Sequence, residues 1–421
     1  MSKAFVSKFG GASIKDAPAL KNLVSILNNR LRNNQIIVIS AMGKTTNALE
    51  IILNQKFAQK DYSLNITILK SQHLDICHEL FPEGHVIFSH IENIFLRLQR
   101  VLAPSIQGVD YDQMYDEVVS FGEIISTTIV QEYFCEQKLY CIWQDAREII
   151  TTDHNHRAAQ VDWEETKQNC QKRLLPKMAK FPVITQGFLG RSREGRTTTL
   201  GREGSDFTAA ILAFCLDAVE VTIWKDVPGV LNADPKKFDN TVLYRELDYT
   251  KAAEMTYYGA SVIHPKTIKP LANKHIPLWV KSFTDPDAHG TKITHSSLKQ
   301  DIPTFIIKED QLLLTFKVTD FTFIQGIHLQ KIYELLNKLK INVNLVQTSA
   351  ISISVCMDND FFKLDKLMEA VKGDFEIKYN DGLKLLTVLN YTTALTAKYE
   401  EEKQILLEQR TRNSYQIIFT D

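Results

Sequence analysis

The residues best suited to chemistry gather in one glycine-rich stretch, residues 181–210, which reads FPVITQGFLGRSREGRTTTLGREGSDFTAA. Its glycines let the backbone approach a ligand closely, and Arg202 carries a planar group that can grip a carboxylate or a phosphate with two hydrogen bonds. Ser205 and Asp206 are residue types that cap the N-terminus of a helix, where free N–H groups attract negative charge. A flexible surface loop is the common alternative for such a composition. Because an apolar strand precedes this stretch and a capped helix follows it, we favour an anion-binding site.

Two further polar loops have the same setting. A strand over residues 4–9 has Lys8 near its end and runs into Gly10 and Gly11, and a helix follows over about 18–29. A second apolar strand over 35–40 ends at Ser40 and leads into the loop 41–47, which contains Thr46. This alternation of strands and helices predicts a parallel sheet with helices on both faces, and ligands then bind where strands end and helices begin.

The composition sets limits on size, partners and compartment. A chain of 421 residues is long enough for two or three domains. A net charge of −1 argues against nucleic acid as the main partner. The six cysteines include no C-x-x-C pair, so neither a zinc site nor a disulfide framework is predicted, and no apolar run approaches the length needed to span a membrane. We therefore expect a cytoplasmic protein without a membrane partner.

The region 54–115 is predicted to be mainly helical, with an amphipathic helix over 86–102. No two of its four histidines are four residues apart, so we expect no metal site and interpret them as solvated or capping residues: His73, His78, His85 and His90. The segment 116–123 is predicted to open the next helix. Glu123 would then lie near a helix start, where its carboxylate could receive the ammonium group of a substrate.

The second half of the chain changes character near residue 290. Before it, a strand over 218–224 ends in a turn-rich segment, 225–236, whose charged residues suit a nucleotide or a metal–phosphate group; a helix over 250–258 and a strand over 277–282 follow. Residues 291–303 are predicted to be a linker. Beyond them we expect strands at 311–319, 342–347, 351–357, 384–389 and 416–420, and helices at 328–340, 361–371 and 398–410. This α+β region carries no catalytic cluster, which favours a regulatory or dimerising role.

Six motifs, in this order along the chain, resemble those of the aspartate kinases of the amino-acid kinase superfamily: KFGGAS (8–13), VISAMGKTTN (38–47), VSFGE (119–123), QGF with GRTTTLGREGSD (186–206), WKDVPGVLNADPK (224–236) and GASVIHPKT (259–267). The resemblance implies an α/β fold: an amino-acid-kinase-type parallel-sheet α/β sandwich over residues 1–295. It also implies a regulatory region of two ferredoxin-like ACT units over 305–421, the second of them shortened.

The resemblance also implies a reaction, in which ATP, with Mg²⁺, phosphorylates the side-chain carboxylate of L-aspartate to give 4-phospho-L-aspartate. This is the first step toward the aspartate-family amino acids lysine, threonine and methionine. A carboxylate is already ionised at pH 7, so catalysis requires positioning and charge neutralisation rather than a general base. A homodimer formed through the ACT region and an amino-acid effector are further expectations of the resemblance.

The resemblance assigns a role to each matching residue. It implies that Lys8 and Asp206 are catalytic, with Lys8 at the phosphates. The substrate side would comprise Ser40, Thr46, Glu123 for the ammonium group, Arg202 for the α-carboxylate, and Ser205. The nucleotide side would comprise Lys8, Gly10, Gly11, Lys225, Asp226, Asn232 and Lys236.

Several positions depart from the family pattern. Glu203 stands where the substrate loop usually has glycine, and we expect its side chain to face solvent; Ala12 and Ser261 replace the usual threonine and lysine. In the first ACT-like unit, Asn344 and Ala350 replace acidic residues that face the effector in lysine-sensitive relatives, so we expect feedback by lysine to be weak, absent or retuned. Two alternatives stay open: a kinase for another small carboxylate or for UMP, and a catalytically silent, ligand-sensing subunit.

Overall fold

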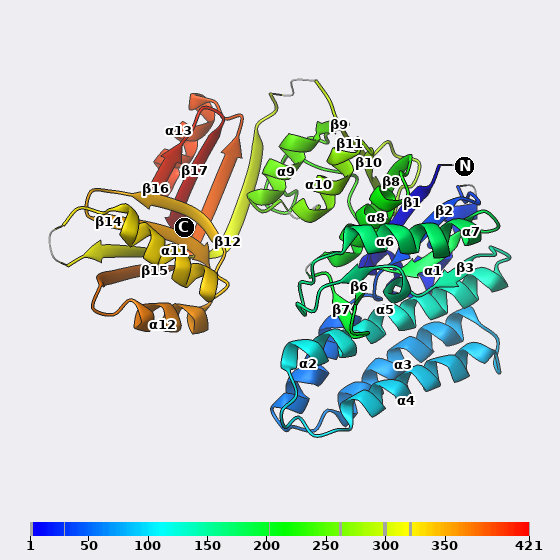
Figure 1. The fold of residues 1–421 in the computed structure, drawn as a ribbon. Coiled ribbons are helices and arrows are strands. Elements are labelled where there is room, and N and C mark those ends of the chain that lie inside the picture. Colours follow the sequence, from blue (N-terminus) through cyan, green and yellow to red (C-terminus); the bar gives the residue numbers. More distant parts are fainter. Residues whose placement is uncertain are drawn as a thin grey trace. The chain divides into compact units, whose positions relative to one another are not determined.

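The computed structural model describes residues 3–28, 30–201, 203–260, 263–297, 301–319 and 322–420. The chain forms two compact units, coloured along the sequence in Figure 1. The first comprises Met1–Val230, Leu243–Ala253 and Ser261–Leu298, and the second Leu231–Val242, Glu254–Ala260 and Lys299–Asp421. Each unit has its own sheet.

An eight-stranded sheet organises the first unit. Neighbouring strands are parallel except for β10 and β11, as the alternation of strands and helices predicts. Strand β2 is buried along its whole length, as expected for the apolar run QIIVI in the middle of a covered sheet. From edge to edge the strands are β3 (Ile142–Gln144), β5 (Val183–Gln186), β2 (Gln35–Ile39), β1 (Phe5–Phe9), β8 (Glu220–Lys225), β10 (Leu278–Ser282), β11 (Thr291–Thr294) and β9 (Glu246–Asp248).

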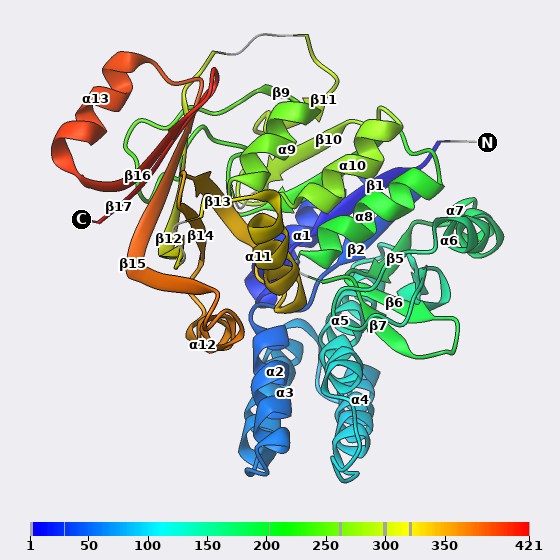
Figure 2. The same cartoon turned by 60° about the vertical axis from the view of Figure 1, so that its left-hand side comes forward.

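Helices pack on both faces of this sheet (Figure 1). Helix α8 packs on one face of β1, β2 and β8, and α10 packs beside it. A bundle of α2, α3, α4 and the first part of α5 extends away from the sheet (Figure 2). The helices that lie wholly in the first unit are α1 (Ala17–Asn28), α2 (Thr45–Phe57), α3 (Ser63–Leu80), α4 (Val86–Leu102), α5 (Tyr111–Glu136), α6 (Trp163–Asn169), α7 (Leu175–Met178), α8 (Gly204–Cys215) and α10 (Pro265–Asn273). Helix α9 (Tyr249–Tyr257) begins in the first unit and ends in the second.

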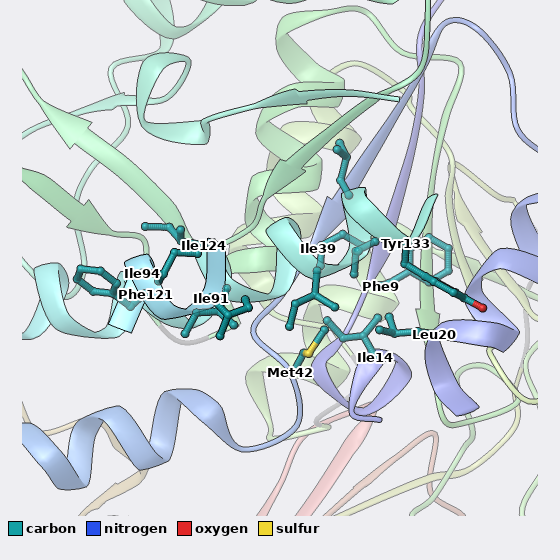
Figure 3. Packing of buried hydrophobic residues seen from close by; sticks show 14 of the residues in the cluster. Phe9, Ile14, Leu20, Ile39, Met42, Ile91, Ile94, Phe121, Ile124 and Tyr133 are labelled. Carbon is teal, nitrogen blue, oxygen red and sulfur yellow. The ribbon is translucent and has the colours of Figure 1, made fainter. Parts of the chain in front are cut away.

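The main core lies where the helical bundle meets the sheet. Phe9 and Ile39 from the sheet pack among side chains from α1 and α5, such as Leu20 and Tyr133, as Figure 3 shows. Helix α4 has the predicted bounds, and its buried residues recur every three or four positions, so the predicted amphipathic helix is confirmed. Burying this apolar surface fixes the strand ends that carry the candidate site.

The glycine-rich stretch is more ordered than the sequence suggested. It contains a hairpin, β6 (Leu189–Ser192) with β7 (Thr197–Thr199), which joins β4 (Thr151–Thr152) in a small second sheet. Helix α8 begins at Gly204 after the capping residue Glu203, so Ser205 and Asp206 lie in the first turn rather than capping it. The expected cap at Ser205 and Asp206 is therefore wrong, since the capping position is Glu203.

The second unit is built on a six-stranded antiparallel sheet. Its long strands β12 (Thr304–Val318) and β15 (Phe375–Leu389) pair along most of their length and run through both halves of the sheet. The first half follows a strand–helix–strand–strand–helix–strand order with α11 (Gly326–Lys338), β13 (Val343–Thr348), β14 (Ser352–Asp358) and α12 (Phe361–Ala370). The second half adds α13 (Thr393–Glu402), β16 (Gln404–Arg410) and β17 (Ser414–Thr420).

Three further sequence-based expectations are wrong. The segment 116–123 lies in the middle of α5 instead of opening a helix, because α5 already starts at Tyr111 after its cap Asp110. The predicted linker contains β11, which pairs with β10 and completes the first sheet. Residues 404–410 are a strand rather than a helix, since they pair with β17. Helix α10 was not predicted. Within the residues described, no helix is both long and apolar enough to cross a membrane.

Candidate active site

The predicted catalytic pair forms at the carboxyl ends of neighbouring strands. Lys8 Nζ, at the end of β1, lies 2.6 Å from Asp206 Oδ1 in the first turn of α8, and both side chains are buried, with 7% and 1% of their surface exposed. Lys225, at the end of the adjacent strand β8, lies 3.2 Å from the other oxygen of Asp206. Although burial raises it, the pKa of Asp206 is held below its usual value by the positive charges of Lys8 and Lys225. The carboxylate therefore holds two ammonium groups side by side at the edge of the sheet.

A cavity of about 570 Å³ in the first unit brings the predicted substrate residues together. The loop after β2, the middle of α5 and the start of α8 form its walls. Ser40, Thr46, Glu123 and Ser205 all line it, as does Gly11 from the predicted nucleotide side. Arg202, the predicted partner of the substrate carboxylate, lies outside the described residues. The cavity is lined by Gly11, Ser40, Ala41, Gly43, Thr46, Asn47, Glu50, Tyr115, Glu123, Arg157, Phe188, Gly201, Glu203, Gly204 and Ser205.

Glu123 presents an unsatisfied carboxylate oxygen. Its side chain is 3% exposed, and its Oε1 accepts a hydrogen bond of 3.2 Å from the backbone N–H of Ala41. Its Oε2 is buried without a hydrogen-bond partner. Burial raises the pKa of Glu123 to about 8. A buried carboxylate oxygen without a donor is costly, and an ammonium group bound in the cavity would satisfy it.

Two glycines are required by close backbone approach. A Cβ atom on Gly11 would lie 2.7 Å from the carbonyl oxygen of Ala41, which is too close for any other residue. A Cβ atom on Gly187 would lie 2.4 Å from the Cβ of Ser205. These contacts pack the loops after β1, β2 and β5 tightly around the cavity, as the glycine-rich motifs predicted.

Glu203, whose side chain we expected to face solvent, is partly buried and lines the cavity. Its backbone is left-handed, with φ of 54°, a conformation that favours glycine. The residue that replaces the family's glycine therefore forms part of the cavity wall.

The predicted nucleotide residues are divided between the two units. Gly10 lies beside Lys8, since a Cβ atom on Gly10 would be 3.4 Å from Lys8 Nζ, and Asp226 is exposed directly after Lys225. Asn232 and Lys236 belong to the second unit. There the side-chain amide of Asn232 bonds to two backbone groups of the same unit: it donates to the carbonyl of Pro303 at 2.9 Å and accepts from the N–H of Val242 at 2.6 Å. Lys236 is exposed.

Sequence reasoning missed several residues of the cavity. Glu50, Tyr115 and Arg157 line it without belonging to a recognisable motif. Phe188 also lines it; it belongs to the QGF motif, but no role was predicted for it. Arg157 lies in a polar loop with no periodic signal, so only the fold reveals it.

The histidines of the helical region behave in different ways. His85 caps α4 by accepting from the N–H of Ile87 at 3.1 Å, which confirms the capping interpretation for this residue. His73 is instead buried: its Nδ1 lies 2.8 Å from the carbonyl of Leu69 and its Nε2 lies 3.2 Å from Thr45 Oγ1. Burial lowers the pKa of His73, so the ring is neutral at pH 7. In the described part of the chain, His, Cys, Asp and Glu form no group of three that could hold a metal ion.

Comparison with known proteins agrees with this geometry. The model of the amino acid kinase family matches residues 3–282. The chain is 31% identical over 404 residues to the lysine-sensitive aspartokinase 3 of Escherichia coli, a match that covers 92% of this chain and 87% of that relative. It is 34% identical over 370 residues to the chloroplastic aspartokinase 2 of Arabidopsis thaliana, covering 84% and 66% of the two chains.

Solved structures extend the match to the fold of the whole chain. Aspartokinase III of E. coli in complex with aspartate and ADP aligns with a TM-score of 0.84 at 27% identity, over 99% of this chain and 96% of that one. The same enzyme in complex with lysine and aspartate aligns with a TM-score of 0.79 at 28% identity. These matches confirm the expected fold class, an α/β kinase fold followed by an α+β regulatory region. The chain therefore belongs to the amino acid kinase family and, within it, to the aspartokinases.

Proposed function

We propose that this chain transfers the γ-phosphoryl group of ATP to the side-chain carboxylate of L-aspartate. The observation that carries the proposal is the unsatisfied Oε2 of Glu123, which lines a cavity beside the start of α8, the helix that holds Asp206 with Lys8 and Lys225. An ammonium group on Glu123 would identify the substrate as a free amino acid. The E. coli relative solved with aspartate and ADP supports aspartate as the acceptor and ATP as the donor.

The chain's own residues account for the catalytic requirements. The attacking carboxylate needs no base, because it is ionised at pH 7. Lys8 and Lys225 would neutralise charge on the transferring phosphoryl group, and Asp206 positions both ammonium groups before the reaction. Ser205 and the N–H groups at the start of α8 would bind a substrate carboxylate together with Arg202.

Mg²⁺ fits this proposal as a partner of the nucleotide. In kinases it is held by one or two carboxylates and by phosphate oxygens, and it neutralises phosphate charge. Asp206 and the exposed Asp226 are the carboxylates on the nucleotide side of the first unit. Because Asp206 is already paired with two lysines, phosphate oxygens would supply most of the metal's ligands.

We further propose that the second unit is a regulatory and dimerising region with weakened or absent sensitivity to lysine. Asn344 is engaged within this unit: its Oδ1 accepts from Lys308 Nζ at 2.7 Å, and its Nδ2 donates to Gln311 Oε1 at 2.7 Å and to Asp358 Oδ1 at 2.9 Å. An uncharged side chain bound in this way offers no free carboxylate to a cationic effector. Strong inhibition by millimolar lysine would contradict this part of the proposal, and a monomer in light scattering would contradict the dimer.

The six unpaired cysteines suit the cytoplasmic location that we also propose.

The activity is tested by measuring ADP release from Mg-ATP with L-aspartate, L-glutamate or N-acetyl-L-glutamate. We expect turnover with L-aspartate only, and its loss in a Lys8→Met variant. Because Glu203 lines the cavity, a Glu203→Gly variant is measured in parallel. Turnover in that variant but not in the wild type would favour a catalytically silent subunit, and turnover with another acceptor would contradict the proposed substrate.

A further inference from the structure

We propose that Arg157 is a further substrate-recognition residue, whose guanidinium supplies positive charge to the aspartate cavity and whose backbone is held in place by Asp116. This inference rests on the proposed function, because it concerns how the same cavity selects a dicarboxylic amino acid.

The charges around the cavity call for a cation. Glu50, Glu123 and Glu203 all line it, whereas L-aspartate itself carries two carboxylates and one ammonium group. Like charges gathered around one cavity repel each other, and burial strengthens the repulsion. Among the described residues that line the cavity, Arg157 is the only one with a positively charged side chain. Its charge offsets that of the glutamates and attracts the anionic substrate.

The backbone of Arg157 is fixed by a buried carboxylate. Its N–H lies 3.1 Å from both oxygens of Asp116, a fully buried residue of α5. Asp116 also accepts from Thr199 Oγ1 at 2.5 Å and from His156 Nδ1 at 2.8 Å. These bonds hold Arg157 in a left-handed conformation, with φ of 66°, which costs energy in any residue other than glycine. A conformation of this kind persists only where the surroundings enforce it.

The side chain of Arg157 is held as well. Its guanidinium carbon lies 4.4 Å from the centre of the Tyr115 ring, which also lines the cavity. One guanidinium nitrogen lies 3.2 Å from a carboxylate oxygen of Asp112. An exposed ion pair of this kind adds little to stability, so stability alone does not account for the strained backbone and the buried carboxylate beneath it. Preorganisation of a substrate-binding charge accounts for both.

The same loop supports the glycine-rich stretch. A Cβ atom on Gly201 would lie 3.2 Å from the carbonyl oxygen of Arg157, and the N–H of Ala159 donates to the carbonyl of Thr199 at 3.0 Å. Asp116 therefore anchors both Arg157 and the segment that leads through Thr199 to the start of α8. We call Arg157 a recognition residue and Asp116 a positioning residue.

The test compares Arg157→Gln, Arg157→Lys and Asp116→Asn with a control, Arg193→Gln. Arg193 is an arginine of the nearby hairpin, paired with Asp162 and Glu165 and 69% exposed. We expect Arg157→Gln to raise KM for L-aspartate about tenfold, the effect of one charge-assisted contact, while KM for ATP stays within about a factor of two. Arg157→Lys retains the charge and should recover part of the loss. In Asp116→Asn, KM for aspartate should rise in the same direction, and the control should resemble the wild type.

Ionic strength provides a second measurement that a structural role would not alter. In the wild type, added salt screens the charge of Arg157, so KM for aspartate should rise with salt concentration. In Arg157→Gln this charge is absent, so KM for aspartate should rise less. If the wild type turns aspartate over and Arg157→Gln has the same KM for aspartate, this inference is overturned and the proposed function stands. A wild type that neither turns over aspartate nor binds it in calorimetry would overturn the proposed function and this inference with it.

Discussion

The buried carboxyl of Glu123 gives a prediction that can be worked through in detail. Its pKa is raised to about 8 by burial, yet it must be ionised to bind an ammonium group. Ionisation therefore costs about 1.4 kcal/mol for each pH unit below 8, and the affinity for aspartate should fall about tenfold per unit. We expect KM for aspartate to rise steadily from pH 8 to pH 6.

Replacing Glu123 by glutamine separates charge from shape. Glu123→Gln keeps an oxygen that can accept from Ala41 but removes the anionic partner of the substrate. Loss of a charge-assisted hydrogen bond costs about 1.5–3 kcal/mol, so KM for aspartate should rise by a factor of roughly 10 to 150 and lose its dependence on pH. KM for ATP should stay close to that of the wild type.

The same variant should stabilise the protein without substrate. The folded-state pKa of Glu123 is raised above the usual value of 4.5, so the folded state binds more protons than the unfolded state between pH 4.5 and pH 8. This contribution to stability is fully present below pH 4.5 and is lost as the pH rises through 8. At pH 7 the loss amounts to roughly 3 kcal/mol as an upper estimate, which glutamine avoids.

Two assays check this reasoning. Initial rates at saturating ATP give KM for aspartate from pH 6 to pH 8.5, and thermal unfolding from pH 5 to pH 8.5 gives the stability of both proteins. The reasoning is refuted if KM of the wild type is independent of pH over this range, or if Glu123→Gln binds aspartate as tightly as the wild type.

Substitutions at three further positions test other features of the site. Gly187→Ala should lower the free energy of unfolding by about 1–3 kcal/mol, measured as a lower unfolding temperature, because its Cβ would overlap Ser205. It should also lower kcat. Wild-type values of both quantities would mean that the loop has room for the methyl group. His73 contacts Thr45, the neighbour of the cavity residue Thr46. His73→Gln keeps a nitrogen near Nε2 that can contact Thr45, whereas His73→Asn keeps only one near Nδ1, so KM for aspartate should rise more in the asparagine variant. Equal KM values in the two variants would exclude a role for the Thr45 contact. Glu203→Gly should raise the free energy of unfolding by about 1 kcal/mol, because glycine adopts the left-handed conformation without strain. It should also lower KM for aspartate, because it removes a carboxylate from a residue of the cavity wall. A higher KM would show that this carboxylate assists binding.

The parts of the fold that follow hydrophobic pattern could be read from the sequence. The apolar run of β2 and the three-to-four spacing of α4 are set by which faces are buried, and periodicity reports that directly. Predictions failed where long-range contacts decide the conformation. The segment 404–410 is rich in helix-forming residues, but its pairing with β17 makes it a strand. Helix α8 starts at Gly204, directly after Glu203, whose left-handed conformation is uncommon for a residue other than glycine and could not be predicted from its type.

The candidate site was predictable as far as its motifs extend. Lys8 and Asp206 stand 198 positions apart in the sequence, and the resemblance to a kinase family placed them together before the fold brought them to 2.6 Å. Arg157 has no such motif, and its role follows from its place in the cavity wall and from the buried Asp116 beneath it. Residues of this kind depend on packing between distant segments, which local patterns do not encode.

Trapping the acyl phosphate product tests the central claim most directly. The purified chain is incubated with Mg-ATP, L-aspartate and hydroxylamine, which converts an acyl phosphate into a hydroxamate that mass spectrometry identifies. The account predicts aspartate hydroxamate on the side-chain carboxyl, formed in equal amount to ADP and absent with L-glutamate. ADP release without this hydroxamate, or a hydroxamate from another acceptor only, would contradict it.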